Sequence, residues 1–132
     1  MKSIFADTFY FLALLNPIDQ HHEKTVRLAG GLKAKFVTTE WVLIEVADAV
    51  AGKRSRSQFF PFLWRLERSL FWEIISSENL FKKSLVFYDQ HRDKDWTLTD
   101  CASFVVMREH EITDALTGDR HFEQAGFTAL LK

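Results

Sequence analysis

Short apolar runs and longer amphipathic stretches follow one another along the whole chain. Runs such as residues 2–6 (KSIFA) have the length of strands, whereas apolar residues three or four positions apart, as at Val42, Val46 and Val50, indicate the buried face of a helix. We predict strands at residues 2–6, 35–38, 72–76, 113–117 and 127–131. We predict helices, including their capping residues, at 8–15, 19–31, 39–51, 59–70, 76–88 and 97–109, with a helical turn at 120–124.

Polar residues, glycines and prolines mark the expected ends of these elements. Asp19 is suited to cap the second helix, Gly30-Gly31 to close it, and Ser76 or Ser77 to cap the fifth. Thr97 or Thr99 is suited to begin the sixth helix. Pro61 is compatible with a helix only in its first turn, so we expect the fourth helix to begin shortly before it.

Strands that alternate with helices predict a mainly parallel sheet covered by helices on both faces. We therefore expect a three-layer α/β/α sandwich with about five strands, formed by residues 1–132 as a single domain. The 47% of hydrophobic residues supply enough apolar surface for such a core. Sheets of this kind bind ligands outside the carboxyl ends of their strands, so those ends are the place to look for function.

Composition excludes several classes of protein. A formal net charge of −1 argues against binding nucleic acid or membrane by overall charge. A lone Cys101 excludes an internal disulfide framework and a cysteine zinc site. The longest apolar run, residues 8–15, is far shorter than the ~20 residues that span a bilayer, and we expect a cytoplasmic protein without membrane contact.

Four acidic residues stand where the strand ends are expected to meet. Asp7 closes the first strand, Glu45 lies in the helix after the second, Asp100 opens the helix before the fourth strand, and Asp119 follows that strand. Two carboxylates ~5 Å apart repel by about 3 kcal/mol at an effective dielectric constant of ~20, so a cluster of four needs protonation or cations. Oxygen ligands suit hard divalent ions, and Mg²⁺ or Mn²⁺ is the expected cofactor.

Each acid also has an ordinary explanation. Asp7 and Asp119 are placed to cap the helices that follow them, and Asp100 can form a capping box with Thr97. Glu45 can be an exposed residue at the flank of its helix. Taken singly, none of the four is specific.

Their order along the chain resembles a known family. The segments Trp96-Thr97-Leu98-Thr99-Asp100-Cys101 and Thr117-Gly118-Asp119-Arg120-His121-Phe122 carry the resemblance, which covers essentially the whole length. The chain is similar to PIN domains, especially the small toxin-like ribonucleases called VapC. Asp7, Glu45, Asp100 and Asp119 match the four family acids, and Thr117 matches the hydroxyl residue two places before the last.

The resemblance implies a metal-dependent endoribonuclease that is the toxin of a toxin–antitoxin pair. It implies an RNA substrate, a cognate antitoxin and a homodimer. We expect Asp7 and Asp100 to bind the principal metal ion, and Glu45 and Asp119 to complete its shell, bind a second ion or position water. Thr117 is expected to orient a carboxylate or water.

Residues 52–76 match the family least, so substrate choice is expected to reside there. The turn before the fourth helix is basic and the helix itself is aromatic, which makes both candidates for contact with RNA or a partner: Lys53, Arg54, Arg56, Phe59, Phe60 and Trp64. Solvated basic residues and core aromatics explain the same pattern.

One alternative from another class is a non-catalytic PIN-like module that binds RNA or protein. It differs from the enzyme in requiring no stabilisation by Mg²⁺. A receiver-type phosphotransfer domain using Asp7 ranks lower, because no suitable lysine follows the fourth strand.

Overall fold

The computed structural model describes residues 1–132 and contains one five-stranded sheet. The strands are β1 (Lys2–Ala6), β2 (Ala34–Thr39), β3 (Trp72–Ile75), β4 (Asp114–Leu116) and β5 (Thr128–Ala129). Their order is β3-β2-β1-β4-β5, and every neighbouring pair is parallel. All five strands lie where the sequence predicts them, and the parallel arrangement is confirmed.

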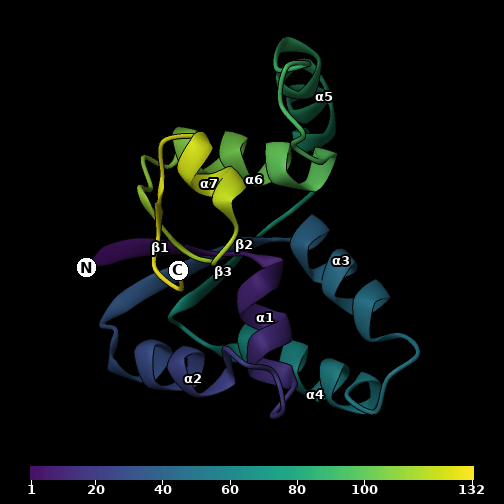
Figure 1. Cartoon of the computed structure of the whole chain (residues 1–132), viewed down its shortest axis with the longest axis vertical. Helices are drawn as coiled ribbons and strands as arrows, with labels where there is room; N and C mark the ends of the chain where they lie inside the picture. Colours follow the sequence, from purple (N-terminus) through teal and green to yellow (C-terminus); the bar gives the residue numbers. More distant parts are fainter.

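Helices cover both sides of this sheet (Figure 1). They are α1 (Thr8–Leu15), α2 (His22–Gly31), α3 (Glu40–Val50), α4 (Arg56–Arg68), α5 (Leu80–Gln90), α6 (Leu98–Glu109) and α7 (Arg120–Gln124). In Figure 1, α1, α2 and α4 lie below the sheet, α6 and α7 lie above it, and α5 lies at the top of the view, packed against α6. The expected three-layer sandwich is therefore confirmed.

Three predicted helix starts are wrong by a few residues. Asp19 accepts a hydrogen bond from the His21 N–H at 2.7 Å, which closes a turn, and α2 begins only at His22. Neither Ser76 nor Ser77 caps α5, because the chain turns at Asn79, whose φ of 64° is left-handed, and α5 begins at Leu80.

The start of α4 is the clearest correction, because Pro61 lies in its second turn rather than its first. The helix begins at Arg56, three residues before the predicted start. Pro61 and Ser57 are both exposed, so water can satisfy the Ser57 carbonyl that Pro61, lacking an N–H, leaves without a helical donor.

The two carboxy-terminal strands are shorter than expected because their pairing is short. β1 pairs with β4 through Phe5 with Ala115 and Ala6 with Leu116, and β4 pairs with β5 over two residues as well. The pairing nevertheless brings the end of β4 beside the end of β1. The loop after β4 is thereby fixed next to the start of α1.

The hydrophobic core lies on both faces of the sheet and contains 27 buried residues. Phe5, Phe11, Phe104 and Phe122 are fully buried, and the ring centroids of Phe104 and Phe122 lie 4.9 Å apart. This packing fixes α6 and α7 above the sheet, and with them the acidic residues at their first turns. No helix combines the length and apolar character needed to cross a bilayer.

Candidate functional site

The four acidic residues lie at the carboxyl edge of the sheet, each on a different segment. Asp7 follows β1 directly, Glu45 is in the second turn of α3, Asp100 is in the first turn of α6, and Asp119 precedes α7. The charges of Asp100 and Glu45 both act on the carboxyl of Asp7. The sequence prediction that these residues converge therefore agrees with their placement.

Asp7 is the most deeply buried of the four, with 5% of its surface exposed. The pKa of its carboxyl is raised from 3.8 to about 7, chiefly by burial and to a smaller extent by the neighbouring charges of Asp100 and Glu45. Hydrogen bonds from the Thr117 side chain and the Thr8 backbone oppose this rise in pKa without cancelling it. The fold thus holds a carboxylate where its negative charge is costly.

Hydroxyl groups hold one oxygen of Asp7 and one of Glu45. Thr117 Oγ1 donates to Asp7 Oδ2 at 2.9 Å, and Thr8 Oγ1 donates to Glu45 Oε1 at 2.5 Å. Thr117 Oγ1 in turn accepts from the Asp119 N–H at 3.1 Å. Thr117 therefore links the end of β1 to the loop that carries Asp119.

Backbone amides hold one oxygen of each remaining acid. The Thr97 N–H donates to Asp100 Oδ2 at 3.1 Å, and the His121 N–H donates to Asp119 Oδ1 at 2.9 Å. The second carboxylate oxygens of Glu45, Asp100 and Asp119 accept no hydrogen bond from the protein. The only fully buried side-chain polar atom without a partner is Thr25 Oγ1, so these oxygens keep access to solvent. Glu45, Asp100 and Asp119 are thus each oriented through one oxygen and open at the other.

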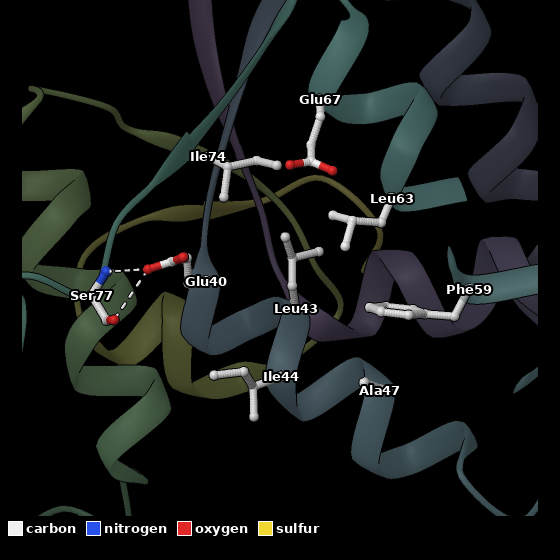
Figure 2. Close-up of a pocket in the computed structure, with 9 residues that line it drawn as sticks. All are labelled: Glu40, Leu43, Ile44, Ala47, Phe59, Leu63, Glu67, Ile74 and Ser77. Atoms are coloured by element: carbon white, nitrogen blue, oxygen red, sulfur yellow. Dashed lines mark hydrogen bonds between the residues drawn. The ribbon is translucent and has the colours of Figure 1, made fainter. Parts of the chain in front are cut away.

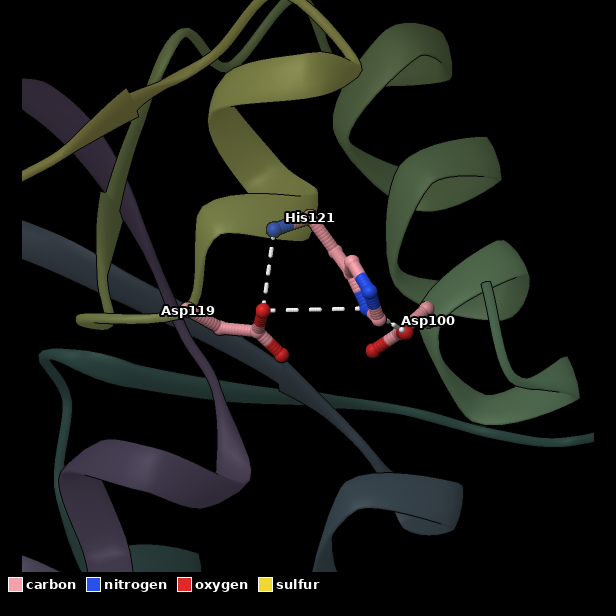
Figure 3. Close-up of side chains that lie close together, drawn as sticks. All are labelled: Asp100, Asp119 and His121. Atoms are coloured by element: carbon pink, nitrogen blue, oxygen red, sulfur yellow. Dashed lines mark hydrogen bonds and ion pairs between the residues drawn. The ribbon is translucent and has the colours of Figure 1, made fainter. Parts of the chain in front are cut away.

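His121 joins Asp100 to Asp119 (Figure 3). Its Nδ1 lies 2.9 Å from Asp100 Oδ2 and 3.7 Å from Asp119 Oδ1. One possible ligand atom from each of these three residues lies within 4.8 Å of the other two. Sequence reasoning missed both His121 and Thr8, although each stands within two positions of a predicted acid.

The donor set fits a hard divalent cation. Carboxylate oxygens are the ligands that Mg²⁺ and Mn²⁺ prefer. No lysine or arginine forms an ion pair with any of the four acids, and His121 is the only basic side chain that contacts two of them. The protein therefore leaves most of the negative charge at this edge without a counter-charge of its own.

The ordinary explanations for the acids prove partly correct. Asp100 and Thr97 form a full capping box, and Asp119 caps α7 through the His121 N–H. The Asp7 side chain makes no capping bond to α1, and Glu45 is half-buried rather than exposed. Capping and convergence coexist, because a cap at the start of a helix faces the edge where the strands end.

Gly118 keeps the loop between Thr117 and Asp119 close to α1. A Cβ atom at this position would lie 2.6 Å from Cζ of Phe9, which is closer than atoms can approach without displacement. Any other residue at this position would require the Phe9 ring to move.

The predicted surface residues do not join the acidic site but lie around α4. Lys53 and Arg54 border a cavity of about 570 Å³ that is also lined by the turn after α1, and Arg56 donates to the Ala51 carbonyl at 2.8 Å. Phe60 and Trp64 are 74% and 52% exposed, whereas Phe59 packs against the core. The aromatic cluster is therefore divided between core and surface.

A second hollow separates α3 from α4 (Figure 2). It has a volume of about 310 Å³, and Leu43, Ile44, Phe59 and Leu63 are among its apolar lining residues. Acidic side chains stand within it as well, and one of them, Glu40, accepts hydrogen bonds from the N–H and hydroxyl of Ser77. We refer to this hollow as the α3–α4 groove.

Comparison with known proteins gives a consistent set of relatives. No family model matches the chain. The chain is 27% identical over 125 residues to the 23S rRNA-specific endonuclease VapC20 of Mycobacterium tuberculosis, covering 94% of this chain and 95% of the relative. The same protein from strain H37Rv matches equally.

Solved structures share the fold. The crystal structure of M. tuberculosis VapC20, described as a sarcin-ricin loop cleaving toxin, superposes with a TM-score of 0.84 at 24% identity and covers 96% of this chain and 98% of that one. FitAcB from Neisseria gonorrhoeae gives a TM-score of 0.65 at 18% identity, over 96% and 95% of the two chains. VapBC2 from Rickettsia felis, bound to a DNA fragment from its promoter, gives 0.63 at 13% identity, over 96% of each chain.

Proposed function

We propose that this chain, which resembles VapC-like proteins in sequence and has their PIN fold, is a metal-dependent endoribonuclease and the toxin of a toxin–antitoxin pair. One observation carries the proposal: four carboxylates from separate segments meet at the carboxyl edge of the sheet, each oriented through one oxygen, with no lysine or arginine to neutralise them. A purely structural cluster of this charge would carry a large cost in stability.

Each acid has a distinct role in this proposal. Asp7 and Asp100 hold the principal divalent cation, Mg²⁺ or Mn²⁺. Glu45 and Asp119 complete the shell, hold a second ion or position the attacking water. Thr117 keeps the Asp7 carboxylate oriented through its 2.9 Å hydrogen bond.

The protein contributes orientation and charge rather than a covalent intermediate. When bound, the cation activates water and stabilises the negative charge that develops on the phosphate and leaving oxygen. The hydrogen-bond donors at Thr8, Thr97, Thr117 and His121 are fixed by the fold. They keep each carboxylate in its own orientation, so that it does not turn toward the donor of another. The acids are thereby set before substrate arrives, so little reorganisation is needed during reaction.

RNA is the proposed substrate class. The relative at 27% identity is named as a 23S rRNA-specific endonuclease, and its structure as that of a sarcin-ricin loop cleaving toxin. A synthetic sarcin–ricin loop hairpin is therefore the first substrate to test, with an unrelated hairpin beside it.

The test is cleavage of that hairpin with Mg²⁺ or Mn²⁺ and with EDTA. We expect cleavage by the wild type only with metal, and a loss of at least about 1,000-fold in kcat/KM for Asp100→Asn. Asn keeps an oxygen that can accept from the Thr97 N–H, so α6 should remain capped. Asp48→Asn, an exposed acid-to-amide change on α3, is the matched control and should cleave normally. Metal-independent cleavage, or full activity of Asp100→Asn, would refute the proposal.

The α3–α4 groove and the α4 surface are the proposed contact regions for an antitoxin and for a second copy of the chain. The groove offers aliphatic and aromatic side chains beside Glu40 and Glu67, which suits an apolar segment that also carries basic residues. The exposed Phe60 and Trp64 offer the kind of side chains that anchor interfaces.

A further inference from the structure

His121 has no place in the sequence-derived site, yet it contacts two of the proposed metal ligands. It stands at the second position of α7, with 18% of its side chain exposed, and Phe122 beside it is fully buried in the core. Its ring position is therefore set by the packing of α7 against α6 and the sheet.

The surroundings of Nδ1 determine its role in the hydrogen bond. Asp100 Oδ2 lies 2.9 Å away and already accepts the Thr97 N–H, so that oxygen acts as an acceptor. Asp119 Oδ1, at 3.7 Å, likewise accepts from the His121 N–H. A lone pair on Nδ1 would face two carboxylate oxygens, so Nδ1 carries a proton and donates to Asp100. A nitrogen that carries this proton is not available to bind a metal ion.

We propose that His121 is a positioning residue, which holds Asp100 through Nδ1–H and so keeps the open oxygens of Asp100 and Asp119 aimed at one point. The proposal rests on the proposed function, since it assigns His121 a role toward the same cation. Two donors on Asp100 Oδ2, from Thr97 and His121, fix both the tilt and the rotation of the carboxylate. Loss of the imidazole donor leaves Thr97 alone, and the carboxylate can then rotate about Cβ–Cγ.

The test measures metal binding without RNA, by titrating Mn²⁺ and, separately, Mg²⁺ into metal-free protein in a calorimeter. His121→Phe removes the donor and retains a flat ring, whereas His121→Asn retains an N–H donor near the position of Nδ1. Outer-shell hydrogen bonds of this kind contribute about 10–100-fold to metal affinity. We expect His121→Phe to lower the affinity for both ions by about that factor. The affinity of His121→Asn should stay within a few fold of the wild-type value.

His91→Phe is the matched control. Its Nδ1 also makes a hydrogen bond, 2.7 Å from the Phe87 carbonyl, and its ring stacks on Phe87, but it forms no hydrogen bond or ion pair with the four acids. We expect its affinity for both ions to equal that of the wild type. If His121→Phe fails to fold, as judged by circular dichroism, His121→Leu replaces it in the comparison with His121→Asn.

The outcomes separate three cases. Unchanged affinity in His121→Phe would overturn the positioning role while leaving the proposed function intact. A loss that His121→Asn does not rescue and that is greater for Mn²⁺ than for Mg²⁺ would also overturn it, because it would identify the imidazole as a ligand. Absence of metal binding by the wild type would overturn both this inference and the proposed function.

Discussion

The acidic edge of the sheet and the surface of α4 are built in opposite ways. At the acidic edge, each carboxylate is held by a named donor, and Asp7 and Asp100 are at least nine-tenths buried. On α4, Phe60 and Trp64 are exposed to solvent, and the guanidinium carbon of Arg68 lies 4.5 Å from the centroid of the Trp64 ring. The first region is complete within the chain, and the second is suited to completion by another molecule.

This difference suits the acidic edge to catalysis and the surface of α4 to the recognition of another molecule. In the proposed function, side chains whose geometry is fixed by the fold act on the phosphodiester. In the same proposal, exposed aromatic and basic side chains select which molecule is held there. Substitutions at the acidic edge should therefore change cation binding and turnover, whereas substitutions around α4 should change affinity or assembly.

The substitution Asp7→Asn in metal-free protein gives the strongest test of this comparison between the acidic edge and the α4 surface. The folded pKa of about 7 lies above the unfolded value of 3.8, so the stabilising contribution of protonated Asp7 is complete below pH 3.8 and is lost as pH rises through 7. About three pKa units correspond to about 4 kcal/mol. We expect Asp7→Asn to unfold at higher urea concentration than the wild type at pH 8 in EDTA, with a smaller advantage at pH 5. If Asp7→Asn is less stable than the wild type at pH 8, the ionised Asp7 carboxylate does not destabilise the fold.

Thr8→Val tests whether a donor outside the four acids matters. Valine has nearly the same shape as threonine but cannot donate to Glu45 Oε1, so the carboxylate is free to rotate. We expect about a tenfold lower kcat with little change in KM. Thr25→Val is the matched control, because the buried Thr25 hydroxyl has no partner. Equal kcat for the two variants would remove Thr8 from the site.

The basic turn before α4 should affect substrate affinity alone. We expect the double variant Lys53→Gln, Arg54→Gln to raise KM for the RNA hairpin about threefold at low salt, to leave kcat unchanged, and to lose this difference at high salt. Lys35→Gln, an exposed lysine in β2, serves as the control. A change in kcat would mean that the basic turn takes part in the reaction step rather than only in substrate binding.

The smallest effect on the isolated chain is expected at the exposed aromatics. Phe60→Ser and Trp64→Ser should each change the free energy of unfolding by less than about 0.5 kcal/mol and leave cleavage per site unchanged. If α4 joins two copies of the chain, the double variant should shift from dimer to monomer in light scattering. A dimer that persists would locate the contact elsewhere.

The sequence predicts the fold well, because strand lengths, helix faces and capping residues agree with one another. It misplaces the starts of α2, α4 and α5, where a local turn at Asp19, Asn79 or the residues before Arg56 decides the boundary. Such turns depend on short hydrogen bonds and on φ values that periodicity does not reveal.

The four acids could be predicted from their order along the chain and its resemblance to PIN domains, but their supporting donors could not. Thr8 reaches Glu45 across 37 positions and His121 reaches Asp100 across 21, and only the packed helices bring these pairs together. A threonine or histidine next to an acid is common, so its neighbours in sequence give no sign of its partner in space.

The Asp100 side chain is part of the α6 capping box and is also a ligand in the proposed reaction. This double role has a genetic consequence. Most replacements would remove both the acid and its half of the α6 capping box, the hydrogen bond from the Thr97 N–H to the Asp100 side chain. Asparagine removes the negative charge while keeping an oxygen for the Thr97 N–H. If the chain is toxic to its host, survivors selected for a silent but well-folded protein should carry asparagine at position 100 more often than alanine or valine.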